Sequence, residues 1–147
     1  MDPTNLNSNL GYLITSTAAA MHSLMQSRLT EAGIDIPFEQ LRTLAFLCKN
    51  PGINQQEMAD CLNKTKPGIS RLVDQLEKKD LIRREEDGED RRNKIIFVTD
   101  KGVEARDQFI PYAKKELLLI DDKLGGEEAQ VLKDSLIKLK SILHEIK

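Results

Sequence analysis

The sequence predicts a mainly α-helical fold with one small β-hairpin, an arrangement of the α+β class. Over most of the chain, apolar residues recur every three or four positions, which is the period of an amphipathic helix. This period is interrupted at residues 81–98, where two short β-prone runs flank a polar segment that contains glycine. With 39% hydrophobic and 31% charged residues, the 147-residue chain has the composition of a globular protein.

The composition does not indicate a membrane protein or a metalloprotein. No apolar run approaches the roughly 18–20 residues that cross a bilayer, and the acidic Asp2 stands where a secretory signal carries basic residues, so we expect a cytoplasmic protein. Cys48, Cys61, His22 and His144 lack the spacing of a metal-ligand set, and we expect no metal and no cofactor. Cys48 is expected to pack in the core. An oxidant-sensing thiol stays open for either cysteine, because sensing depends on exposure and acidity.

Two helices are predicted in the N-terminal third. Residues 6–32 carry the apolar stripe of a long amphipathic helix, and Gly33 is placed to end it. A second helix has Pro37 in its first turn and stops at residues 50–52, which read Asn-Pro-Gly. The residues that face inward from this second helix are Leu41, Leu44, Ala45 and Cys48.

A short helix is predicted next, over residues 55–61. Asn54 stands three residues before Glu57, a spacing in which each of the two side chains accepts a backbone N–H at the helix start. The chain then turns tightly at residues 63–64. The residues expected to face the core are Met58, Ala59 and Leu62.

The following helix begins near Thr65 or Lys66. Pro67 lies in its first turn, where the missing N–H costs least. The helix ends at residues 78–79, two lysines that suit the negative end of the helix dipole. Asp80 follows, at a position where a left-handed backbone would end the helix. Asp adopts this conformation more readily than most other non-glycine residues.

The β-hairpin is predicted from residues 81–84 and 94–98. Gly88 and several Asp and Asn residues in the segment 85–93 favour a reversal of the chain. This loop is too long for a two-residue turn, so we expect it to project from the body of the protein.

Two further helices complete the chain. Thr99 or Asp100 caps the first of them, which continues to about Leu124, and residues 125–126, two glycines, interrupt the pattern. The last helix runs to Lys147. Its apolar side carries Val131, Leu132, Leu136, Leu139, Ile142, Leu143 and Ile146.

Two short helices, a tight turn and a hairpin with a basic tip are typical of a winged helix-turn-helix. In that fold the second helix enters the major groove of DNA and presents its N-terminal residues to base edges. We expect a DNA-binding region at residues 35–100, flanked by helical dimerisation segments at 1–34 and 101–147. The residues predicted to contact DNA are Lys64, Thr65, Lys66, Pro67, Gly68, Ser70 and Arg71 in the helix and Asp90, Arg91 and Arg92 on the wing.

The charge distribution agrees with a nucleic-acid partner, although the net charge is −2. Residues 64–94 carry ten basic and eight acidic side chains, whereas acidic residues outnumber basic ones on either side. Two alternatives remain. Arg91 and Arg92 could only balance the acidic residues of their own loop. The winged unit could also bind a protein instead of DNA.

The stretch from Asn54 to Gly102 resembles the MarR family of bacterial and archaeal regulators, and the chain length and flanking helices also fit. The wing sequence with the Thr and Gly that follow it is the specific part, while the helix-turn-helix alone is shared by many families. The matching segments are 58–62 (MADCL), 70–83 (SRLVDQLEKKDLIR), 87–92 (DGEDRR) and 98–102 (VTDKG).

The resemblance implies a homodimer that binds a pseudo-palindromic operator. It also implies that Arg92 enters the minor groove, that Asp90 pairs with it to fix its direction, and that a small aromatic or phenolic effector releases a repressor from DNA. Asp80 stands where many members have glycine. Neither cysteine lies near the start of the first helix, where a peroxide-sensing branch keeps its thiol, which argues against redox sensing.

An effector site is predicted near the meeting of the first, second and fifth helices, although such side chains are more often ordinary core or interface. Its candidate residues are Tyr12, His22, Met25, Arg42 and Phe46. The sequence contains no nucleophile motif and no phosphate-binding glycine loop after a strand, so we expect no enzymatic activity.

Overall fold

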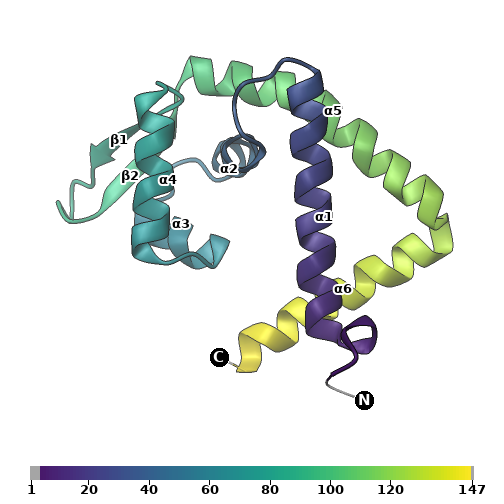
Figure 1. Cartoon of the computed structure of the whole chain (residues 1–147). Helices are drawn as coiled ribbons and strands as arrows, with labels where there is room; N and C mark the ends of the chain where they lie inside the picture. Colours follow the sequence, from purple (N-terminus) through teal and green to yellow (C-terminus); the bar gives the residue numbers. More distant parts are fainter. Residues whose placement is uncertain (1–3, 147) are drawn as a thin grey trace. The chain divides into compact units, whose positions relative to one another are not determined.

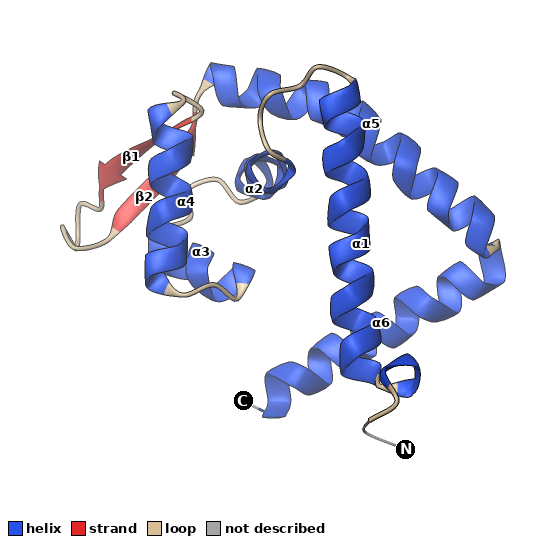
Figure 2. Cartoon of the chain, viewed as in Figure 1, coloured by secondary structure: helices blue, strands red, loops and turns tan. Residues whose placement is uncertain are grey.

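The computed structural model describes residues 4–146, and in that part of the chain it contains six α-helices, one short 3₁₀ helix and one two-stranded sheet (Figures 1 and 2). The predicted mainly α-helical fold with a β-hairpin is confirmed. The elements are η1 (Leu6–Ser8), α1 (Leu10–Glu31), α2 (Phe38–Lys49), α3 (Gln55–Leu62), α4 (Lys66–Lys78), β1 (Ile82–Glu86), β2 (Lys94–Val98), α5 (Asp100–Leu124) and α6 (Gly126–Ile146).

Two compact units are distinguished, Met1–Ile110 and Pro111–Lys147, which we call the winged unit and the C-terminal unit. The boundary lies inside α5, at Pro111. The division into a region at 35–100 and flanking dimerisation segments stays a prediction. Every helix in residues 4–146 is too short or too polar to span a bilayer.

The predicted helix over residues 6–32 is divided in two. The Asn9 side chain accepts a hydrogen bond from the Tyr12 N–H at 3.0 Å and caps α1, so that Leu6 belongs to the separate turn η1. The predicted end at Gly33 is confirmed, because Gly33 has a φ of +74° and the Ile34 N–H donates to the Leu29 carbonyl at 2.9 Å.

The core of the winged unit is formed by α1, α2, α3, α4, the first part of α5 and the base of the hairpin. Its most deeply buried side chains are Leu29, Leu41, Leu44, Met58, Ile69, Val73, Leu76, Leu81 and Ile82. Two details differ from expectation. Pro37 is the residue before α2 rather than part of its first turn, and Cys48 is only half-buried, since Leu47 takes the buried position.

The helix starts of the winged unit follow the predicted pattern. Asn54 and Glu57 form a capping box at α3, with the Glu57 N–H 2.7 Å from Asn54 Oδ1. Thr65 caps α4 by accepting the Gly68 N–H at 3.1 Å. Asp80 has a φ of +59°, the left-handed backbone that was expected.

The hairpin pairs Ile82 with Val98 at its base and Glu86 with Lys94 near its tip. The predicted first strand ended at Arg84, which is wrong. The strand continues to Glu86, where Lys94 Nζ lies 3.3 Å from Glu86 Oε1 and offsets the poor strand preference of Glu. The loop therefore spans residues 87–93. At the base, the Ile96 N–H donates to the Ile53 carbonyl at 3.0 Å and joins β2 to the chain before α3.

In the C-terminal unit, α6 leaves its apolar side uncovered. Gly125 has a φ of +92° and separates α5 from α6 as predicted. Of the described α6 residues only Ala129 is buried. The large apolar residues of α6 that are exposed are Val131, Leu132, Leu136, Ile137, Ile142, Leu143 and Ile146.

Candidate nucleic-acid interface

The first turn of α4 is presented to solvent. Ile69, Leu72, Val73 and Leu76 fix the opposite side of the helix in the core. Thr65, Lys66, Pro67 and Arg71 are exposed, whereas Gly68 and Ser70 are half-buried. Within residues 4–146, neither Lys66 nor Arg71 forms an ion pair, so both cations are available to an anionic partner. The positive end of the helix dipole adds to this character.

Lys64 differs from the other predicted contact residues. Its Nζ lies 2.7 Å from Glu39 Oε1 on α2, and the hydrogen bond and charge of Lys64 lower the pKa of Glu39 below its ordinary value of 4.5. Lys64 is therefore partly neutralised. The sequence offered no signal for this partner, which stands 25 residues earlier in the chain.

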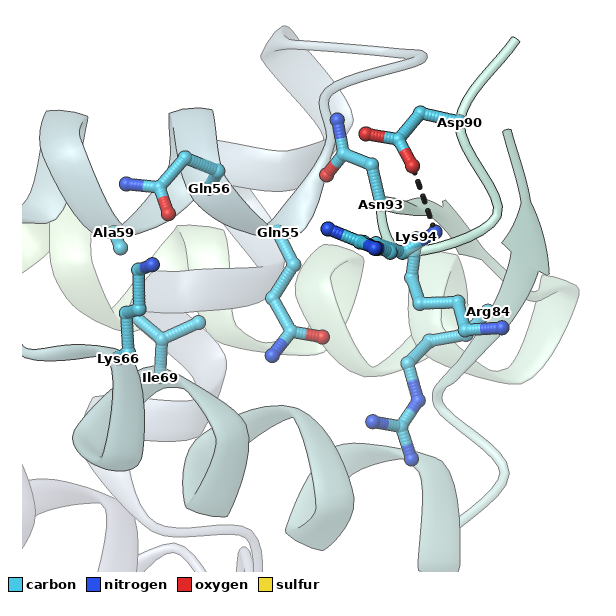
Figure 3. A pocket seen from close by; sticks show the side chains of 10 residues that line it. Gln55, Gln56, Ala59, Lys66, Ile69, Arg84, Asp90, Asn93 and Lys94 are labelled. Carbon is cyan, nitrogen blue, oxygen red and sulfur yellow. Dashed lines mark hydrogen bonds between the residues drawn. The ribbon is translucent and has the colours of Figure 1, made fainter. Parts of the chain in front are cut away.

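The wing tip is ordered by hydrogen bonds of its own backbone. Asp90 Oδ1 accepts the Arg92 N–H at 3.0 Å, and the Asn93 N–H donates to the Asp90 carbonyl at 3.0 Å (Figure 3). Asp90 thus holds the backbone of Arg92 rather than its guanidinium. In the described part of the chain, the guanidinium groups of Arg91 and Arg92 form no ion pair with the acidic residues of the loop.

A cavity of about 530 Å³ lies where α3, α4 and the hairpin meet (Figure 3). Cations from α4 and from both sides of the hairpin gather around it, and α3 contributes amide groups. The lining residues are Gln55, Gln56, Ala59, Lys66, Ile69, Arg84, Asp90, Arg92, Asn93 and Lys94. Of these, Lys66, Asp90 and Arg92 were predicted from the sequence to contact DNA. The other polar residues were missed, because their meeting depends on strand register and not on a local motif.

The predicted effector residues are brought together only in part. The His22 ring packs edge-on against Phe38 with centroids 5.1 Å apart, and the Arg42 guanidinium lies 5.3 Å from the centre of the same ring. Phe109 also contacts Phe38, at 5.9 Å. Sequence reasoning missed both phenylalanines. Met25 is buried, Phe46 is half-buried, and Tyr12 is exposed about 15 Å along α1 from His22.

The chain is similar in sequence and fold to known regulators of transcription. The model of the MarR family matches residues 34–93. The chain is 31% identical over 112 residues to an uncharacterized HTH-type transcriptional regulator of Bacillus cereus, a match that covers 76% of this chain and 69% of that protein.

Two solved structures of similar fold contain DNA. The crystal structure of the S. aureus MepR–DNA complex has a TM-score of 0.81 and 29% identity, and the match covers 92% of this chain and 98% of that one. The transcriptional repressor CouR bound to a 23-mer DNA duplex has a TM-score of 0.82 and 25% identity, with 95% and 98% covered.

Proposed function

This chain belongs to the MarR family, whose matched members are transcription regulators and not enzymes, and on that premise we propose that it is a homodimeric repressor of transcription. In this proposal the dimer binds a pseudo-palindromic operator and a small effector releases it. The observation that carries the proposal is the set of unpaired cations at the start of α4 and on the wing tip, in a fold similar to two DNA complexes.

The recognition step follows from the placement of α4. Its buried apolar side leaves Ser70 and Arg71 near the exposed N-terminal end, where side chains reach base edges in a major groove. Thr65 and Lys66 at the same end offer a hydroxyl and a cation to phosphates, and Pro67 and Gly68 allow close approach of the backbone. Lys64 contributes less, because Glu39 competes for it.

The wing supplies the second contact. Arg92 has its backbone fixed by Asp90, and among residues 4–146 its guanidinium has no ion-pair partner, which suits insertion into a narrow minor groove. Arg91 beside it is suited to a phosphate. The minor groove carries little sequence information beyond A·T against G·C, so the wing adds affinity more than specificity.

Dimerisation is supported by the uncovered apolar side of α6. An exposed apolar surface of this extent on a small protein usually marks an interface. A groove of about 470 Å³ lies near the α5–α6 turn, and its lining includes Leu124, Val131 and Leu132. Apolar side chains of a second copy could bind in this groove. Two-fold symmetry of the protein then requires two-fold symmetry of the operator, with half-sites about one helical turn apart.

The proposed effector is a small aromatic or phenolic molecule. His22 and Arg42, which both lie next to the Phe38 ring, provide an aromatic surface and a cation for an acidic or phenolic group. Met25 and Phe46 would extend the apolar surface, and Tyr12 stands farthest from it.

Selection of bound duplexes from a random DNA pool, followed by binding isotherms at several salt concentrations, tests the proposal. Arg92→Ala should weaken binding to all duplexes by similar factors and reduce the salt slope by about one. Asp90→Ala should give a milder form of that defect. Arg71→Ala should cost about 1–3 kcal/mol at particular base positions.

The matched control is Arg106→Ala, because Arg106 is already paired with Asp107 at 2.9 Å. Its affinity should equal that of the wild type. A uniform loss for Arg71→Ala would mean that Arg71 binds only phosphate. Failure to recover any duplex would favour the alternative in which the winged unit binds a protein. Transcription from the selected site, with and without candidate phenolic acids, tests repression and release.

A further inference from the structure

We propose that Arg84 is a positioning residue, which Asp74 and Glu77 on α4 hold so that it fixes the direction of the wing relative to that helix. The inference deepens the proposed function, since the consequence for DNA rests on Arg92 reaching a groove. The contacts of Arg84 with Asp74 and Glu77, which we call the joint, are present in the protein without DNA.

Arg84 makes an unusually complete set of contacts with α4. Its Nη2 lies 2.8 Å from Asp74 Oδ1 and 2.9 Å from Glu77 Oε1, and its Nε lies 3.3 Å from Glu77 Oε2. The Arg84 backbone N–H also donates to Glu77 Oε2, at 3.2 Å. Glu77 therefore holds both the strand and the side chain that leaves it. Asp74 and Glu77 are three residues apart and share one side of α4.

The position of Arg84 along the hairpin gives these contacts their effect. β2 is anchored near its middle, where Ile96 is buried and bonded to Ile53. On β1, Ile82 is buried at the base, whereas Glu85 and Glu86 are exposed. Arg84 is thus the point nearest the tip at which β1 is held to the body. Beyond it, the loop 87–93 depends on the direction that the strands have there.

The charges favour a structural joint over a direct DNA contact. Two carboxylates face one guanidinium, which leaves no excess positive charge for a phosphate. The hydrogen bond from Arg84 lowers the pKa of Glu77 below its ordinary value of 4.5, and the same bond raises the pKa of Arg84. The Arg84 side chain is 25% exposed, against 65% for its neighbour Arg83.

Two substitutions separate positioning from simple charge. Glu77→Gln removes a negative charge, so electrostatics alone predicts stronger DNA binding, whereas loss of the joint predicts weaker binding. Arg84→Lys keeps the positive charge but lacks the planar fork that engages two carboxylates. Glu85→Gln is the matched control, because Glu85 is on the same strand and, in the described part of the chain, pairs only with Arg83, at 3.2 Å.

The first experiment is amide hydrogen exchange of the full chain without DNA. Glu77→Gln and Arg84→Lys should each accelerate exchange in residues 86–94 about three- to tenfold, with α2 and α3 at wild-type rates and Glu85→Gln unchanged. Wild-type exchange of the hairpin in both variants would overturn the proposal. So would an equal acceleration across α2, α3 and the hairpin, because that reports general loss of stability.

The second experiment measures how Arg92→Ala acts in two backgrounds on the selected duplex. The factor by which Arg92→Ala weakens binding should shrink severalfold when Glu77 is already Gln. A wing that is no longer held in one orientation does not place Arg92 in the minor groove, so the loss of Arg92 then costs less. An equal factor in both backgrounds would overturn the positioning role. If the wild type binds no duplex, the proposed function fails, while the exchange experiment still decides whether Arg84 holds the wing.

Discussion

The helices α4 and α6 are both amphipathic, yet only α4 covers its apolar side within its own unit. Ile69, Leu72, Val73 and Leu76 of α4 are all buried. The apolar side of α6 is longer, and Ala129 is its one buried member among the described residues. Apolar area removed from water contributes about 25 cal/mol per Å². Burial of the exposed apolar side of α6 would therefore add stabilisation that the isolated chain lacks.

The difference separates two uses of the same pattern. On α4 the apolar side fixes the helix to the core, so that its polar N-terminal end is held in a defined direction. On α6 the apolar side is available to a second molecule. A substitution on α4 should therefore change the stability of the winged unit at any protein concentration, and one on α6 should act through association.

The largest effect is expected from Leu76→Ala. Leu76 is fully buried, and removal of its side chain leaves a cavity in the core of the winged unit. The free energy of unfolding should fall by about 2–5 kcal/mol. Urea denaturation at two protein concentrations checks this, because a loss within the winged unit should be the same at both. A loss below about 1 kcal/mol would show that α4 is less tightly packed than its burial indicates.

Leu136→Glu should have the next largest effect, through dimerisation. Leu136 is 45% exposed and lies on the apolar side of α6, so a charge there would be buried without a partner in the proposed dimer. The free energy of association should weaken by about 2–4 kcal/mol, measured by sedimentation over a concentration series.

Ile137→Glu is the control for Leu136→Glu. Ile137 is 69% exposed and is the next residue, but at 3.6 residues per turn it lies among lysines on the opposite side of α6. Its dimer should match the wild type. Equal weakening by the two substitutions would contradict an interface on the apolar side, and an unchanged dimer in both would remove α6 from the interface.

The sequence predicted most of the fold because most helix ends depend on nearby residues. Asn54 with Glu57, Thr65 with Pro67, and Gly33 each act within one turn of the helix that they begin or end. Some errors came from local caps that were not recognised, such as Asn9 before α1, and others arose where distant contacts decide. β1 continues to Glu86 because of Lys94 on the other strand.

The candidate site was predictable to the same extent. Lys66, Arg71 and Arg92 stand out because a helix start and a wing have local signatures. Lys64 was grouped with them, although Glu39 pairs with it across the fold. Arg84 gave no signal at all, since a basic residue in a β-prone run is typical of an exposed strand. Only the register of the hairpin brings it to Glu77.

Gly102→Ala tests the buried packing of the winged unit at a second place, the start of α5, where Gly102 is buried. A Cβ at Gly102 would lie 2.1 Å from the Leu81 carbonyl oxygen and 2.7 Å from Val98 Cγ1, so backbone would have to move. We expect a loss of about 1–3 kcal/mol in the free energy of unfolding. Gly126→Ala, where a Cβ meets no atom within 4 Å, is the control and should be close to neutral. Equal stability of the two variants, by thermal denaturation, would contradict this close approach.

The smallest expected effect is a loss of stability in acid that belongs to the winged unit. The pKa values of Glu39 and Glu77 are both lowered from 4.5, chiefly by hydrogen bonds from Lys64 and Arg84. A carboxyl whose pKa is lowered by folding stabilises the folded state above its unfolded pKa, and this contribution disappears as the pH falls through the folded pKa. The loss should therefore begin near pH 4.5 and grow below it.

Both carboxylates are partly exposed, so each pair should contribute less than about 1 kcal/mol. The measurement is the free energy of unfolding from about pH 6 to pH 3, made on the Leu136→Glu chain, whose weakened association should keep dissociation from adding to it. Replacing Glu39 and Glu77 by Gln together should make the stability of the winged unit fall less steeply with acid. If the doubly substituted chain followed the same pH curve as its parent, the two ion pairs would not stabilise the winged unit, and its stability would rest on the apolar side of α4 and its neighbours alone.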